Sequence, residues 1–225
     1  MNSVKIAALV PMRHDSERVI GKNYRSFGGK PLYHHIVQAL LDCPEIEQVC
    51  IDTDSPFILD DAPQQFPKVQ CLVRPEPLRS GMTSMNAVLA NTLAQIDADL
   101  YLQTHSTNPL LKSSTISQAI QQLLNSPQYD SLFGVTRLQT RLYDANGNAV
   151  NHDPDILLRT QDLPPIYEEN SNLYLFTKDV FTQRQNRIGN HPILFEIDRD
   201  EAWDIDEEVD FRIAEMMYFY QQEKS

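Results

Sequence analysis

Short apolar runs alternate along the chain with longer stretches in which apolar residues recur every three or four positions. The short runs are typical of strands buried in a parallel sheet, and the recurring positions are typical of helices with one apolar face. The predicted strands are residues 4–10, 49–52, 69–73, 100–103 and 193–197, and the predicted helices are residues 31–40, 84–96, 114–124 and 207–222. This alternation predicts an α/β fold with a mainly parallel sheet and helices on both of its faces.

Residues 138–170 break the alternation, and residues 144–147 within them (Asp-Ala-Asn-Gly) have the composition of a hairpin turn. We expect this stretch to be a small excursion from the sheet that serves in contact between copies of the chain. No linker divides the sequence, so residues 1–225 are predicted to form a single domain.

The composition is that of a soluble protein, with 41% hydrophobic and 22% charged residues. No apolar run approaches the roughly 18 residues of a membrane span, and no signal-peptide pattern opens the chain. We therefore expect a cytoplasmic protein with no membrane partner. The three cysteines, at positions 43, 50 and 71, lack the spacing of a metal site and are expected to be reduced thiols.

The formal net charge of −12 is unevenly distributed along the chain. Residues 1–30 carry six Lys or Arg against two acids, whereas residues 196–210 carry nine acids and one base. The acidic body disfavours a nucleic acid partner, because it repels the phosphate backbone. A small anion held by the N-terminal segment is compatible with this distribution.

The polar loop at residues 11–23 follows the first predicted strand and contains three cations, Arg13, Arg18 and Lys22. Ligands of parallel sheets bind beyond the carboxyl ends of the strands, where fixed cations and backbone N–H groups can surround a triphosphate. Arg13 supplies a bidentate fork and Lys22 a point charge, so the two suit different phosphates. The loop is not a Walker A loop, and an ordinary solvated surface loop is equally consistent with its composition.

Asp204-Ile205-Asp206 follows the last predicted strand and places two carboxylates at positions i and i+2. In extended backbone these side chains project to the same side, where they can hold a hard cation such as Mg²⁺. The alternative is structural, with Asp206 as the N-cap of the helix at residues 207–222 and two glutamates in its first turn. The histidines offer less, since His34 and His35 fall in a predicted helix and His105 has no partner by spacing. No G-x-S-x-G occurs, so a serine hydrolase is not expected.

Several of these segments together resemble the acylneuraminate cytidylyltransferase (CMP-sialic acid synthetase) family. The opening matches in residues 8–13 (Ala-Leu-Val-Pro-Met-Arg), in Ser16, Lys22 and Asn23, and in Gly-Lys-Pro-Leu at residues 29–32. Further matches follow in order: Thr53-Asp54-Ser55, Arg74-Pro75, Leu102-Gln103, Pro109-Leu110, Asp204-Ile205-Asp206 and Asp210-Phe211. The resemblance covers nearly the whole chain.

The resemblance implies a Rossmann-like three-layer α/β/α nucleotidyltransferase fold and, usually, a homodimer. It implies an enzyme that transfers CMP from CTP to an acidic, nonulosonic-type sugar, depends on Mg²⁺ and releases pyrophosphate. The CMP-sugar would feed cell-surface glycan synthesis. The metal and the cations would neutralise charge on the α-phosphate and on the leaving group during in-line attack by the sugar hydroxyl.

The resemblance also implies roles for individual residues. Those implied in nucleotide binding are Arg13, Ser16, Lys22, Asn23, Arg74, Ser84 and Gln103. Those implied in sugar binding are Gln103, Arg159 and Gln161. Those implied in catalysis are Arg13, Lys22, Asp204 and Asp206, with Asp204 and Asp206 holding Mg²⁺.

The chain departs from the family pattern in the first loop and on the sugar side. His14 and Asp15 stand where the family commonly has two glycines, and Glu17 adds a further acid beside the phosphates. These acids oppose anion binding unless Arg18 or Arg25 pairs with them. Glu168 and Glu169 stand where sialic acid enzymes often place a cation. The acceptor sugar and the group that deprotonates its hydroxyl therefore remain open.

Two other functions are compatible with the sequence. A glycosyltransferase also uses a D-x-D motif to hold a nucleotide-sugar diphosphate, but it has no need for Arg13 and Lys22. A non-catalytic nucleotide or sugar sensor would keep binding and lose the chemistry.

Overall fold

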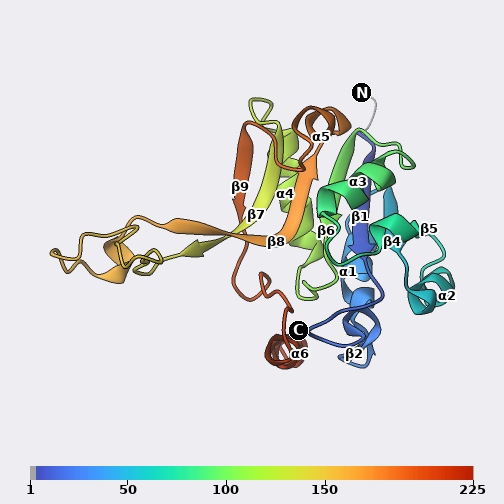
Figure 1. Cartoon of the computed structure of the whole chain (residues 1–225), viewed down its shortest axis with the longest axis horizontal. Coiled ribbons are helices and arrows are strands. Elements are labelled where there is room, and N and C mark those ends of the chain that lie inside the picture. The colour runs from blue at the N-terminus through green and yellow to red at the C-terminus, as the bar shows by residue number, and fades with distance from the viewer. Residues whose placement is uncertain (1–3, 225) are drawn as a thin grey trace.

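The structure, a computed structural model, describes residues 4–224 and is built around a seven-stranded sheet (Figure 1). The strand order is β5-β4-β1-β6-β8-β7-β9; β8 is antiparallel to both of its neighbours, and all other pairs are parallel. The strands are β1 (Ile6–Met12), β4 (Gln48–Thr53), β5 (Gln70–Val73), β6 (Leu100–Thr104), β7 (Ser131–Leu138), β8 (Ile166–Phe176) and β9 (Pro192–Glu196). This confirms the predicted mainly parallel α/β fold. Residues 1–3 and 225 of the predicted single domain lie outside the described residues.

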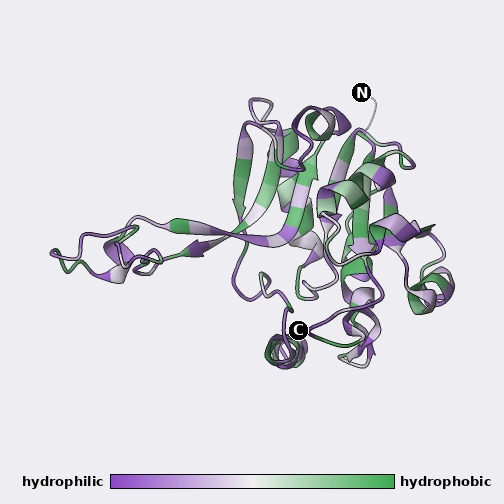
Figure 2. Ribbon diagram, viewed as in Figure 1, coloured by the Kyte–Doolittle hydropathy of each residue, from purple (hydrophilic) through white to green (hydrophobic). Residues whose placement is uncertain are grey.

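Helices cover both faces of the sheet, as the alternating side chains of β1 require. Ile6, Ala8 and Val10 face one buried cluster, whereas Ala7 and Leu9 face the other. The first cluster includes side chains of α1 (Leu32–Leu41), α2 (Pro56–Gln65) and α4 (Ser113–Leu124), and the second includes side chains of α3 (Met85–Leu93) and α5 (Lys178–Arg184). Figure 2 shows the hydrophobic positions concentrated in the central strands. Among residues 4–224, none of the helices has the length and hydrophobicity of a membrane-spanning segment.

The C-terminal helix α6 (Glu208–Gln222) returns to the first loop and packs on a third apolar cluster that contains Val19, Phe27 and Phe211. Its N-cap is Glu207, which forms a capping box with Asp210, so the prediction of Asp206 as N-cap was wrong. The reason is local: the Asp210 carboxylate accepts hydrogen bonds from the backbone N–H of both Asp206 and Glu207, and the helix starts one residue later. The side chain of Asp206 is thereby available for other contacts.

The predicted excursion is present as an arm that projects from the body (Figure 1). Beyond a bulge between Phe133 and Val135, β7 and β8 continue as a two-stranded ribbon up to the pair Leu138–Ile166. The predicted turn at residues 144–147 forms: the Gly147 N–H donates to the Asp144 carbonyl at 3.0 Å, and Gly147 has a φ of 83°. Consecutive apolar residues on the arm are exposed, Ile156 at 56%, Leu157 at 88% and Leu158 at 45%.

The cysteines and two of the histidines have the structural roles expected of them. Cys43, Cys50 and Cys71 are free thiols. His34 and His35 are buried in α1, and burial lowers the pKa of His35 to about 4, so its Nε2–H donates to the Phe27 carbonyl from a neutral ring. These groups belong to the packing of the body.

Candidate active site

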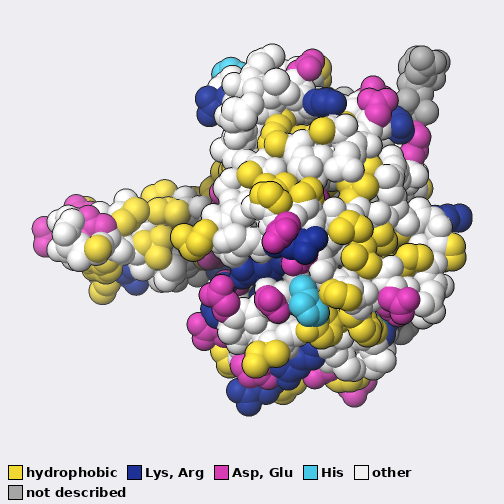
Figure 3. Space-filling model, turned by 45° about the vertical axis from the view of Figure 1, so that its right-hand side comes forward, with side chains coloured by type: hydrophobic (Ala, Val, Ile, Leu, Met, Phe, Trp, Pro, Cys, Tyr) yellow, Lys and Arg dark blue, Asp and Glu magenta, His cyan; other side chains and the backbone are white. Residues whose placement is uncertain are grey.

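The segments after β1, β5 and β6 line a cavity of about 610 Å³, here called the central cavity. This cavity brings together five of the predicted site residues, which lie on the first loop and after β5 although the sequence separates them by up to 61 positions. Those residues are Arg13, Ser16, Lys22, Asn23 and Arg74. The face drawn in Figure 3 carries basic and acidic side chains next to one another, a surface suited to a small ligand of localised charge.

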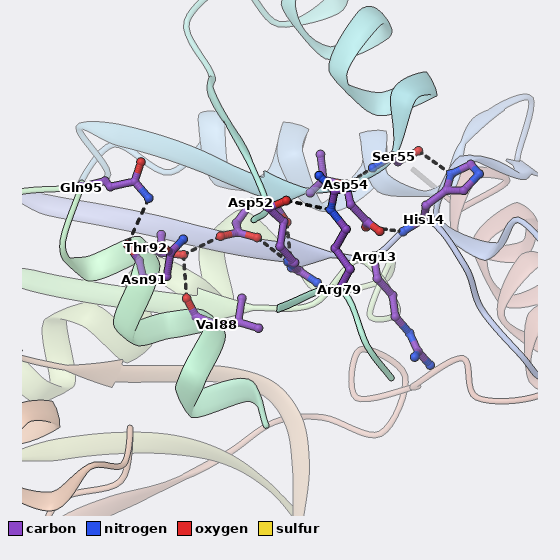
Figure 4. A network of polar contacts seen from close by, with 12 residues as sticks. Arg13, His14, Asp52, Asp54, Ser55, Arg79, Val88, Asn91, Thr92 and Gln95 are labelled. Carbon is purple, nitrogen blue, oxygen red and sulfur yellow. Dashed lines mark hydrogen bonds and ion pairs between the residues drawn. The ribbon is translucent and has the colours of Figure 1, made fainter. Parts of the chain in front are cut away.

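The first loop is held in place by contacts to the loops after β4 and β6. The Asn23 amide donates to the Arg13 carbonyl at 2.7 Å and accepts from the Ser106 hydroxyl at 2.6 Å, so Asn23 fixes the backbone that carries Arg13. The His14 N–H donates to the Asp54 carboxylate at 2.7 Å, and the His14 ring lies 3.0 Å from the Ser55 hydroxyl (Figure 4). Where the family commonly has glycine, His14 therefore anchors the loop.

The acids of this loop are balanced differently from the expected pattern. Arg13 Nη1 lies 3.9 Å from Glu17 Oε1, so Glu17 pairs with the cation of its own loop. Arg18 instead contacts Asp206, and Arg25 forms two hydrogen bonds, at 2.6 and 2.7 Å, with Glu208. Arg18 and Arg25 thus do not pair with the acids of the loop, because Asp206 and Glu208, at the start of α6, take both arginines.

Arg74 belongs to a buried ionic network beneath the cavity. Its Nε donates to Asp52 Oδ1 at 2.6 Å, and Thr92 of α3 donates to the other oxygen of Asp52 at 2.9 Å (Figure 4). The side chains of Arg74 and Asp52 are only 6% and 2% exposed. The buried carboxylate is thus fully paired, and the network orients Arg74 where it lines the cavity.

Asp204 and Asp206 flank the buried Ile205, and neither lines the central cavity, although Asp206 contacts Arg18, which does. Both aspartates line a second cavity of about 450 Å³, here called the acidic cavity, whose walls include Glu168, Glu169 and Asp210. Burial raises the pKa of Asp204, and its Oδ1 has no hydrogen-bond partner among the described residues. Lys22 lines the central cavity and also contacts the segment that carries the two aspartates, because its Nζ donates to the Ile205 carbonyl at 2.6 Å. Burial lowers the pKa of Lys22, and the attraction of Asp206 and Asp204 opposes this effect.

The Asp204–Asp206 pair fits a divalent cation. A buried carboxylate oxygen without a partner is costly unless a cation or donor approaches it, and Asp204 Oδ1 is such an atom. Both residues offer hard oxygen ligands of the kind that Mg²⁺ takes. Within residues 4–224, no group of three or more His, Cys, Asp or Glu side chains is arranged to hold a metal ion, so the protein offers this site two carboxylates.

Gln103 lies one layer behind the central cavity and is fully buried. Its Nε2 donates to the Thr104 carbonyl at 3.0 Å and to His105 Nε2 at 2.9 Å, and its Oε1 accepts from Arg187. Burial, with Arg187 and Lys22 nearby, lowers the pKa of His105 to about 3, so the ring is neutral and accepts at Nε2. His105 lines the central cavity, so Gln103 acts on that surface through its neighbour.

Arg187 is a site residue that sequence reasoning missed. Its guanidinium lies 3.5 Å from the centre of the Tyr174 ring and 3.7 Å from Glu169, and its side chain is only 15% exposed. It lines a smaller cavity of about 270 Å³ beside Met85, and Met85 also borders the central cavity. Arg187 follows α5 in a segment without a motif, so no sequence signal marked it.

Besides Gln103, Asp204 and Asp206, three predicted site residues do not line the central cavity of the described chain. Ser84 is the N-cap of α3 and borders the smaller cavity beside Arg187. Arg159 lies on the arm, where it pairs with Asp162 at 2.7 Å with 73% of its side chain exposed. Gln161 borders a separate cavity of about 520 Å³ with Arg137 and Glu196. The roles of these three residues remain predictions.

Comparison with known proteins shows which family the chain belongs to. Residues 7–225 match the sequence profile of a family described as cytidylyltransferase. The chain is 29% identical over 238 residues to the CMP-N,N'-diacetyllegionaminic acid synthase of Legionella pneumophila, covering 98% of this chain and 99% of that protein. It is 25% identical over 226 residues to the pseudaminic acid cytidylyltransferase of Campylobacter jejuni, covering 96% and 97%.

Among solved structures, the fold resembles that of CMP:2-keto-3-deoxy-manno-octonic acid synthetase complexed with CTP. The TM-score is 0.71 at 16% identity, over 97% of this chain and 99% of that chain. At this identity the likeness is one of fold.

Proposed function

The chain belongs to the cytidylyltransferase family, and from this premise we propose that it transfers CMP from CTP to an acidic sugar of the nonulosonic type and releases pyrophosphate. The observation that carries the proposal is the central cavity, where Arg13, Lys22 and Asn23 form one wall, with the Asp204–Asp206 pair in the neighbouring acidic cavity. Its relatives include enzymes named CMP-N,N'-diacetyllegionaminic acid synthase and pseudaminic acid cytidylyltransferase. In this proposal the cationic wall would hold the nucleotide, and an adjoining polar space would hold the acceptor.

In the proposed reaction a sugar hydroxyl attacks the α-phosphorus of CTP in line with the leaving group, and its oxygen forms the new bond as its proton is lost to water. The bond between the α-phosphorus and the bridging oxygen breaks, and pyrophosphate leaves with that oxygen. Arg13 binds the triphosphate through its guanidinium, and Lys22 stabilises the developing negative charge from a fixed position against the Ile205 carbonyl. A magnesium ion held by Asp204, Asp206 and phosphate oxygens would supply further charge neutralisation.

The experiment that tests this proposal is pyrophosphate release from CTP and Mg²⁺ over a panel of acidic sugars, with a chelator control. The panel includes legionaminic, pseudaminic and N-acetylneuraminic acids and 3-deoxy-manno-octulosonate. We expect release with at least one sugar and none after chelation. Release that persists in chelator would contradict the metal role, and CTP binding without release across the panel would favour a binding protein.

The predicted sugar-binding side of the site carries acids, whereas the wall proposed to bind the nucleotide carries cations. Glu169 is paired with Arg187 at 3.7 Å, so the acid that stands where a cation was expected has its own internal counter-ion. We propose that Gln103, held between Arg187 and His105, shapes the acceptor side, with Arg159 and Gln161 as sugar contacts. In this proposal the CMP-sugar is a donor for cell-surface glycans, made in the cytoplasm.

We further propose that the protein is a homodimer whose copies meet through the arm. The arm exposes Ile156, Leu157 and Leu158, an apolar segment that a partner copy would bury. In such a dimer Arg159, which lines none of the cavities described for its own chain, would be available to the other copy. We expect light scattering at micromolar concentration to give twice the chain mass, and Leu157→Asp with Leu158→Asp to give the monomer mass. A monomeric parent protein would contradict the dimer.

A further inference from the structure

One ion pair connects the central cavity to the acidic cavity. Arg18 Nη2 lies 2.5 Å from Asp206 Oδ1, and the two side chains are 59% and 49% exposed. Arg18 lines the central cavity together with Arg13 and Lys22, whereas Asp206 lines the acidic cavity. The pair therefore joins a cation on the nucleotide wall to a carboxylate of the proposed metal site.

The two partners have competing uses. A divalent cation at Asp206 would bind the carboxylate that Arg18 now contacts, and one carboxylate oxygen does not serve both at full strength. Lys22 has a different fixed partner, the Ile205 carbonyl, and Arg13 faces Glu17 across 3.9 Å. Of these three cations, Arg18 is therefore the one whose present partner, Asp206, would bind the metal instead. Its half-exposed side chain has room to turn within the cavity that it lines.

We propose that Arg18 exchanges Asp206 for the triphosphate of CTP when a divalent cation binds to Asp206. Arg18 is then a substrate-binding residue that becomes available only with the metal, and metal and nucleotide favour each other's binding. Before exchange, the Arg18–Asp206 contact neutralises a carboxylate that would repel the incoming phosphates. The inference rests on the proposed function, because it takes CTP as the ligand of the central cavity.

The test compares Arg18→Gln with a matched control, Arg25→Gln. Arg25 lies just after the same loop and forms a similar half-exposed pair with Glu208, 37% and 49% exposed, but is not among the residues that line either cavity in the described chain. Two readouts are used: Mn²⁺ binding without nucleotide, followed by electron paramagnetic resonance up to millimolar concentration, and CTP binding in Mg²⁺, followed by calorimetry.

The exchange predicts effects of opposite sign. Arg18→Gln removes the competitor for Asp206, so Mn²⁺ affinity is expected to rise about twofold to fivefold, the range of an exposed ion pair. The same variant lacks a phosphate ligand, so CTP affinity in Mg²⁺ is expected to fall by about tenfold. Arg25→Gln is expected to change neither affinity by more than about twofold.

Each of the other outcomes overturns the proposed exchange. Unchanged or weaker Mn²⁺ binding in Arg18→Gln, or no Mn²⁺ binding to any variant at millimolar concentration, overturns the exchange. A rise in Mn²⁺ affinity with unchanged CTP affinity reduces Arg18 to a counter-ion and also overturns it. If the parent protein binds no CTP in Mg²⁺, the proposed function fails together with the exchange. If the parent binds CTP but the variants lack the expected effects, the exchange alone fails.

Discussion

Replacing Asp204 with asparagine is expected to lower the rate of pyrophosphate release by about a thousandfold or more while leaving the chain folded. The amide keeps the shape of the side chain but loses the negative charge with which Asp204 Oδ1, buried and unpaired among the described residues, would attract a cation. Single-turnover release from CTP measures the loss. Asp200→Asn, an equal charge change at an exposed residue of the same acidic segment, is expected to retain the parent rate.

The same variant, Asp204→Asn, is expected to be at least as stable as the parent although its activity is lower. Burial raises the pKa of Asp204 in the folded chain, so the folded state holds this proton more tightly than the unfolded state. Ionised Asp204 therefore costs stability as pH rises through the folded pKa, and asparagine avoids that cost. Urea unfolding is expected to show Asp204→Asn at least as stable as the parent at pH 7, with the difference vanishing below the ordinary aspartate pKa. A variant that is inactive because it is unfolded would contradict the metal-binding role.

The parallel half of the fold could be predicted because its strands are short apolar runs, and β1, β4 and β6 among them are buried along nearly their whole length. The edge strands β5 and β9 are only partly buried, yet their apolar residues were sufficient to predict them. The polar ends of these strands identify the edge where ligands bind. The antiparallel strand β8 was not predicted, because half of it lies in the solvated ribbon of the arm, where Tyr167, Glu168 and Glu169 remain exposed. Helix α2 also escaped prediction, since it buries only Ile58 and Ala62 and contains Pro63.

The residues of the candidate site likewise divide into those that the sequence could predict and those that it could not. Residues that lie on one continuous loop, such as Arg13, Lys22 and Asn23, could be predicted from their order in the sequence. Partners that meet only in three dimensions could not, and the contact of Arg187 with Gln103 and the pairing of Arg18 with Asp206 are of this kind. The loop residues that departed from the family pattern were informative in structure, because the His14 ring contacts the Ser55 hydroxyl at 3.0 Å, a side-chain contact that glycine cannot make.

Lys22→Met is expected to weaken CTP binding about a hundredfold and to lower pyrophosphate release at least as much, because methionine fills the space without the charge. Burial lowers the pKa of Lys22, so the ammonium itself costs folding energy at neutral pH, while its carboxylate neighbours gain from it. These effects offset each other, but methionine also leaves the buried Ile205 carbonyl without the donor that Lys22 supplies at 2.6 Å, so the free energy of unfolding is expected to fall by about 1 to 3 kcal/mol.

Calorimetry with CTP and Mg²⁺, beside the control Lys30→Met, measures the effect of Lys22→Met on binding. Because the lowered pKa lets Lys22 lose its charge at a lower pH than an ordinary lysine, parent activity should decline on the alkaline side before other lysines titrate, with no such step in the residual activity of Lys22→Met. CTP affinity that survives the substitution would mean that the first loop does not hold the triphosphate. The Asp204–Asp206 motif would then favour a glycosyltransferase-like use of the same fold over cytidylyl transfer.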